Sequence, residues 1–234
     1  MCVRRKNFLA AGSPEVRHMN NMSYILFICV TAPICSLLLV AEQKVRRSVL
    51  FLLIGMGCCL FVSELNGLLN NHLDVDIFYF TTSVTPITEE LTKAIPIFIF
   101  AIAYSDKLDD LMMNAFFLGI GFAVLENLVL LTQNFSSVTL FWAVIRGFAS
   151  GLMHGICTGL VGICISFVRK KKKLLYCGLF ATFSLAIVYH SIFNSLVQSS
   201  SKAINYIGFA LPISAYIPIV YFNSKRKRRS AQAK

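Results

Sequence analysis

The sequence has few charged residues for its length, and this scarcity excludes most soluble proteins. Of the 234 residues, 14% are charged and 56% are hydrophobic, and the mean hydropathy is +0.69. A soluble domain carries about 25% charged residues. The apolar runs are also about 20 residues long, the length that an α-helix needs to cross a bilayer. The composition therefore predicts an all-α fold, a polytopic transmembrane helical bundle.

Several motifs of hydrolases and redox proteins are also missing. The eight cysteines form no CxxC pair, and there is no HExxH, no GxSxG and no Ser-His-Asp set. Most of the cysteines lie inside apolar runs, where a free thiol behaves as a small hydrophobic group. We therefore expect no metal or redox role for them. No internal repeat is visible, which disfavours an inverted-repeat transporter.

Seven apolar runs predict about seven membrane spans. The loops between them are short, which favours antiparallel neighbours in one compact transmembrane domain over residues 22–224. A polar N-terminal segment, residues 1–21, precedes this domain, and a basic tail, residues 225–234, follows it. The predicted spans lie near residues 22–41, 48–70, 80–104, 111–131, 138–168, 174–198 and 203–223.

The net charge of +11 comes largely from two basic blocks at the ends of apolar runs. Residues 169–173 read RKKKK, and residues 225–229 read KRKRR. Because Lys and Arg concentrate in cytoplasmic loops, the charge indicates membrane topology, and no nucleic-acid partner is expected. Seven alternating spans with these blocks inside predict a multi-pass protein of the cell membrane. Its N-terminus would lie outside and its C-terminus in the cytoplasm.

Three ionisable residues fall inside the third predicted span. Glu89, Glu90 and Lys93 lie between Pro86 and Pro96. A charged side chain near the bilayer centre costs about 3 kcal/mol, so such residues usually serve a function. The ammonium of Lys93 is three or four residues from each carboxylate and can contact either one. The prolines predict an interruption of this span, which membranes tolerate where the helix is packed in protein or lines a cavity.

Three more polar residues lie at a similar depth on other spans. Counted from the cytoplasmic end of each span, Glu89 is 15 residues in, Glu126 is 15, His154 is 14 and His190 is 16. At a rise of 1.5 Å per residue, all four lie about 21–24 Å from the inner boundary. We therefore predict that acids and imidazoles from four helices meet in one pocket. Arg146, nearer the outer end of its span, is interpreted as an interfacial anchor.

The fifth span also carries a glycine every fourth residue, from Gly147 through Gly151 and Gly155 to Gly159. Small residues at this spacing are typical of close helix contacts in membranes. We expect this stripe to hold the backbone near a neighbouring helix and so to bring His154 near that neighbour.

Carboxylates combined with imidazoles are typical ligands of zinc. The metal generates hydroxide at neutral pH, and a nearby glutamate can accept the proton. The residues therefore predict hydrolysis of an amide or ester in the membrane; a metal-free variant, in which Glu and His activate water directly, also fits. Two other classes remain open: a proton- or ion-coupled transporter, and a non-catalytic membrane binding or immunity-type protein that keeps the fold.

Four short motifs resemble those of a known family. EELTK (residues 89–93), FAVLEN (122–127), GLMHG around His154 and HSIFN (190–194) are similar to the motifs of the PrsW family of intramembrane proteases, which is related to CAAX prenyl proteases and bacteriocin-processing enzymes. The resemblance covers residues 80–198 approximately, with the motifs in the same order. It implies an intramembrane metalloprotease that cuts a membrane-anchored protein of the anti-sigma-factor class on the extracytoplasmic side.

The resemblance also implies catalytic roles. Glu89 would be the general base, and Glu90 would support it or the metal, with Lys93 beside them. Asn194 would donate a hydrogen bond to the oxyanion. Lys93 stands one position before the arginine of the prenyl-protease form, which argues against a prenylated substrate.

The implied metal site contains His154, His190 and Glu126. The two histidines would be ligands of a zinc ion or would stabilise the transition state. Glu126 stands where the related prenyl proteases carry a histidine, and it would complete the ligand set.

Overall fold

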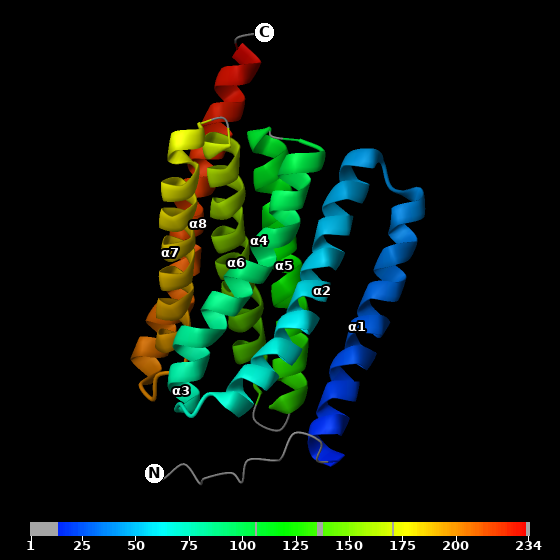
Figure 1. Cartoon of the computed structure of the whole chain (residues 1–234), viewed down its shortest axis with the longest axis vertical. Coiled ribbons are helices and arrows are strands. Elements are labelled where there is room, and N and C mark those ends of the chain that lie inside the picture. Colours follow the sequence, from blue (N-terminus) through cyan, green and yellow to red (C-terminus); the bar gives the residue numbers. More distant parts are fainter. Residues whose placement is uncertain (1–13, 106, 135–137, 170, 233–234) are drawn as a thin grey trace.

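The computed structural model describes residues 14–105, 107–134, 138–169 and 171–232, and these residues form helices joined by short loops, without strands. Residues 1–13 of the predicted N-terminal segment and 233–234 of the predicted tail lie outside the described residues. The predicted all-α bundle is confirmed (Figure 1). Its long helices are α1 (Pro14–Val40), α2 (Gln43–His72), α4 (Thr85–Ala103), α5 (Leu108–Gln133), α6 (Leu140–Val168), α7 (Lys172–Val197) and α8 (Lys202–Gln232).

Five of the described helices, α2, α5, α6, α7 and α8, are long and apolar enough to cross a membrane by length and composition alone. Helix α1 contributes a shorter apolar stretch, Met22–Ser36. Helix α4 has 19 residues and carries the three ionisable residues of the third predicted span. Both helices lie alongside the others in the bundle (Figure 1). The chain is therefore a multi-pass membrane protein, and its orientation stays a prediction.

The helices follow each other up and down, with α1 at one edge of the bundle beside α2 and with α7 and α8 at the other edge (Figure 1). At the end where α2 begins and α4 ends, polar side chains tie the helix ends together. The Arg169 guanidinium donates to the carbonyls of Ala101 and Ile102 at the end of α4. Arg47 of α2 lies 3.6 Å from the carboxylate of Asp110 at the start of α5. We call this the basic end of the bundle, because Arg169 begins the RKKKK block.

The third predicted span is interrupted before Pro86. A short helix α3 (Ile77–Tyr79) and a π-helical turn η1 (Phe80–Val84) precede α4. Pro86 lies in the first turn of α4, directly after η1, so its missing backbone N–H leaves a carbonyl of the preceding helical turn without this donor, and the helix continues through Pro96. Single π-helical turns occur frequently at functional sites. Here the turn ends one helical turn before Glu89.

The predicted glycine stripe on α6 is only partly responsible for close packing. A Cβ added at Gly155 would lie 2.7 Å from the Phe116 ring of α5, so this glycine does make room for a neighbour. At Gly147, nothing lies within 4 Å of an added Cβ, so the prediction is wrong there.

Two glycines of α5 make closer contacts with neighbouring backbones. An added Cβ at Gly119 would fall on the backbone carbonyl of His154, and one at Gly121 would fall on the backbone carbonyl of Leu52 in α2. The absence of side chains at these two glycines therefore lets α5 pack against α6 at His154 and against α2. This packing places the middle of α6 close to the α5 backbone.

Candidate functional site

The predicted convergence of acids and imidazoles is confirmed at the centre of the bundle. Glu89, Glu90 and Lys93 extend from the first half of α4, His154 from the middle of α6 and His190 from α7. Each of the five is at most 4% exposed. Such burial is rare for ionisable side chains unless they have partners, so their mutual contacts define the site.

Glu90 of α4 contacts His190 of α7. It also contacts Lys93, which in turn contacts His154 of α6. Glu90 Oε1 accepts a hydrogen bond from Lys93 Nζ at 2.7 Å and lies 2.9 Å from His190 Nδ1. Lys93 Nζ also lies 2.9 Å from His154 Nδ1 and 4.6 Å from the centre of the Phe122 ring. Charge-assisted hydrogen bonds of this kind are the strong ones. They fix the relative positions of α4, α6 and α7 around the two imidazoles.

Glu126 of α5 lies on the other side of the His154 ring. Its Oε2 is 3.2 Å from His154 Nε2, accepts a hydrogen bond from Ser150 Oγ at 3.2 Å and lies 3.6 Å from Arg146 Nη2. His154 is therefore held through Nε2 by one carboxylate, while its Nδ1 faces the residues of α4.

Sequence reasoning did not assign Ser150 or Arg146 to the site. Arg146 was interpreted as an interfacial anchor, but its guanidinium points to Glu126. The two residues precede His154 by four and eight positions, so they lie on the same face of α6. This spacing is the signal that could have identified them.

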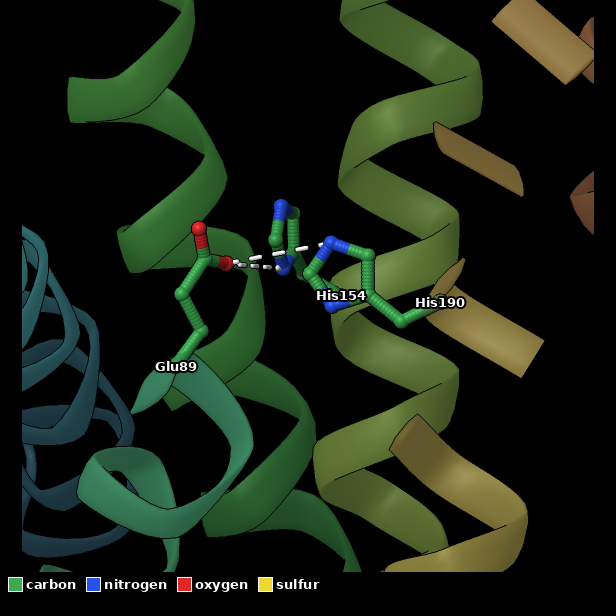
Figure 2. Close-up of side chains that lie close together, drawn as sticks. All are labelled: Glu89, His154 and His190. Atoms are coloured by element: carbon green, nitrogen blue, oxygen red, sulfur yellow. Dashed lines mark ion pairs between the residues drawn. The ribbon is translucent and has the colours of Figure 1, made fainter. Parts of the chain in front are cut away.

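The two imidazoles face one oxygen of Glu89. Oε2 of Glu89 lies 3.8 Å from His154 Nδ1 and 3.8 Å from His190 Nε2. The two rings are nearly perpendicular, at 87°, with centres 4.9 Å apart. Figure 2 shows the carboxylate directed at both rings from the opposite side of the site. One ligand atom from each of the three residues lies within 4.8 Å of the other two.

These three residues fit a metal ion. Glu89 Oε2 and His190 Nε2 are buried and have no hydrogen-bond partner among the described residues, although buried polar atoms rarely lack one. One carboxylate and two imidazoles form a donor set known from catalytic zinc sites. Around a tetrahedral zinc ion, bonds of about 2.0–2.1 Å place the ligand atoms roughly 3.4 Å apart. The two separations between Glu89 Oε2 and the imidazole nitrogens, each 3.8 Å, are close to that value, and all three ligand atoms lie within 4.8 Å of one another.

Lys93 lies against the same nitrogen of His154 that faces Glu89. A ligand role for His154 Nδ1 therefore requires Lys93 Nζ to give up this contact. The ammonium would keep its shorter hydrogen bond to Glu90.

Asn194 is the predicted site residue that the structure does not bring into this group. It lies one turn after His190, and its Nδ2 donates to the carbonyl of Thr81 at 3.0 Å. Thr81 belongs to η1, and its hydroxyl lies 2.9 Å from Gln198 Oε1, just after α7. Asn194 thus holds η1 against α7 near the start of α4.

A cavity of about 350 Å³ gives access to the site from the end of the bundle opposite the basic end. Its walls come mainly from the second halves of α2 and α5, together with α3 and η1. Both Glu89 and Glu126 line it. The cavity therefore connects these two carboxylates to the surface at that end of the bundle.

One comparison with known proteins identifies a family. The model of one family, described as PrsW family intramembrane metalloprotease, matches residues 45–222. This stretch contains every residue of the site. No curated protein and no solved structure gives a significant match.

Proposed function

The chain belongs to the PrsW family of intramembrane metalloproteases, and we propose that it hydrolyses a peptide bond of a membrane-anchored protein at the site formed by Glu89, His154 and His190. One observation carries this proposal. Two buried polar atoms without hydrogen-bond partners among the described residues, Glu89 Oε2 and His190 Nε2, converge with His154 Nδ1, and Glu89 also lines an open cavity.

In this proposal, Glu89, His154 and His190 hold the metal, with zinc as the expected ion. A bound zinc ion supplies hydroxide at neutral pH and polarises a carbonyl oxygen. Glu90 and Glu126 each lie against the other nitrogen of one imidazole. Carboxylates in this position fix the tautomer and orientation of metal-binding histidines. They leave His190 Nε2 and His154 Nδ1 directed at Glu89.

The proposal exchanges two roles expected from the sequence. Glu89 was expected to be the general base and Glu126 a ligand. We place Glu89 in the ligand set because its Oε2 is equally close to both imidazole nitrogens. Glu126 lines the cavity, and the imidazole nitrogen that it contacts is His154 Nε2, which faces away from Glu89. We therefore assign Glu126 as the general base, the carboxylate that accepts a proton from a water molecule in the cavity.

The expected substrate is a membrane-anchored regulatory protein of the anti-sigma-factor class. The predicted topology places the basic end in the cytoplasm, so the cavity would open on the extracytoplasmic side. The substrate would then be cut close to the outer surface of the membrane. Comparing the membrane proteins that accumulate in cells with and without an active copy of the chain tests this assignment.

Metal content and cleavage, measured on the same variants of the purified full-length protein, test the catalytic proposal. Glu89→Gln should lose both stoichiometric zinc and cleavage of a membrane-anchored substrate. Glu126→Gln should bind zinc about 10–100-fold more weakly and lose cleavage even at saturating zinc. Glu64→Gln, on α2 and outside the site, is the control and should keep both. Full zinc content in Glu89→Gln with none in Glu126→Gln would restore the roles expected from the sequence.

A further inference from the structure

Starting from the proposed peptidase function, we infer that the cavity binds about five substrate residues in extended conformation. Their backbone would lie along α2, and their side chains, which must be small and uncharged, would face α5. The site would thus select a substrate segment that can unwind at the end of its membrane span.

The length of the cavity determines how many substrate residues it can hold. Its lining on α2 extends from Cys59 to Asn70 and on α5 from Phe122 to Gln133. Each helix thereby advances eleven positions, or about 16 Å, and both run away from the basic end (Figure 1). Cys59 and Phe122, at the inner end, are buried, whereas Gln133 is exposed. An extended segment of about five residues, at roughly 3.3 Å each, spans this distance.

The wall formed by α2 carries a row of polar side chains. Ser63, Asn66 and Asn70 all line the cavity, and their spacing places them on one face of the helix. The Thr88 hydroxyl donates to Asn66 Oδ1 at 2.7 Å, which connects this wall to the residue before Glu89. An unwound backbone in a membrane must find hydrogen-bond partners in protein or water. Side-chain amides supply both donors and acceptors for it.

The wall formed by α5 is apolar, apart from Glu126 and from Gln133 at its mouth. Leu125, Val129 and Leu130 line it, with the carboxylate of Glu126 among them. Glu89 lies at the inner end, so an acidic substrate residue would meet two carboxylates. A helix is about 10 Å wide with its side chains, and over 16 Å it would need more space than a cavity of about 350 Å³ offers. The cavity therefore fits an unwound segment with small side chains.

Steady-state cleavage in lipid nanodiscs tests the polar wall. The probe is a single-span model peptide whose end carries a five-residue segment of Gly, Ala and Ser, and a matched peptide carries Asp in that segment. Asn70→Leu should raise KM for the first peptide about three- to tenfold, the loss expected for one hydrogen bond, and leave kcat and zinc content unchanged. Asn71→Leu is the matched control, because Asn71 is exposed and does not line the cavity. Equal KM values for the two variants, or equal cleavage of the two peptides, would overturn the inference.

Cross-linking separates this inference from the proposed function. A photoreactive amino acid replaces Val129 in the cavity or, as a control, Leu185, an exposed residue of α7. In a Glu89→Gln background, the first peptide should cross-link at position 129 and not at 185. Cross-linking at 129 without cleavage by the wild-type protein would support the cavity and contradict the peptidase function. Cleavage by the wild type without cross-linking at 129 would keep the peptidase function and overturn the inference.

Discussion

The ion pair between Glu90 and Lys93 leads to a quantitative stability prediction. Both side chains are fully buried, and the Nζ–Oε1 distance is 2.7 Å. Removing one partner of such a pair leaves an uncompensated buried charge, at a cost of about 3–5 kcal/mol. A chain of this size loses roughly 2–4 °C in Tm per kcal/mol. Glu90→Gln should therefore lower Tm by about 10 °C, and Lys93→Met should have a similar effect.

The double variant Glu90→Gln/Lys93→Met tests the physical reason. Because it removes both charges, it should lose much less than the sum of the two single losses, with a coupling of about 2 kcal/mol. Unfolding in detergent can be followed with a thiol-reactive fluorescent dye, since Cys58, Cys59 and Cys157 are free and buried. Additive losses, or an unchanged Tm in Glu90→Gln, would refute the reasoning.

A pair at the surface supplies the control for this cycle. Arg47 and Asp110 are 3.6 Å apart, and both side chains are about one third exposed. Exposed pairs contribute about 0–1 kcal/mol. Asp110→Asn should therefore shift Tm by no more than about 4 °C.

The same structure supports three further predictions. Gly121→Ala should lower Tm by more than about 5 °C in the dye assay, because its Cβ would fall on the Leu52 carbonyl, whereas Gly57→Ala, with open space around it, should change Tm little. Zinc at 100 times its Kd should stabilise the wild type by about 2.7 kcal/mol, and His190→Ala should show no such stabilisation. Ser150→Ala removes one hydrogen bond to Glu126 and should weaken zinc binding about three- to tenfold, measured by competition with a chelating dye.

The candidate site could be predicted from the sequence because a membrane-spanning segment tolerates few ionisable residues. Ionisable residues are costly in lipid, so those within apolar runs stand out, and the constant rise of a helix allowed depth to be counted from each span end. The count placed Glu89, Glu126, His154 and His190 in one layer, and their contacts confirm that they meet. The all-α bundle followed from the same apolar runs.

The sequence could not show which atoms face each other. Asn194 lies only one turn from His190, yet its amide holds η1 in place, because the direction of a side chain depends on how far each helix is rotated about its axis. The glycine stripe on α6 was the visible packing signal, but the closest approach to His154 comes from Gly119 on α5. Helix rotation and interhelical distance are set by the whole bundle, and a single span does not encode them.

X-ray absorption at the zinc edge of the zinc-loaded protein tests the central claim most directly. We predict one zinc ion per chain with two imidazole nitrogens and at least one oxygen in its coordination shell. The Glu89→Gln, His154→Ala and His190→Ala variants should each lose stoichiometric binding. A wild-type protein whose zinc has fewer than two imidazole ligands, or whose zinc content survives all three substitutions, would contradict the account.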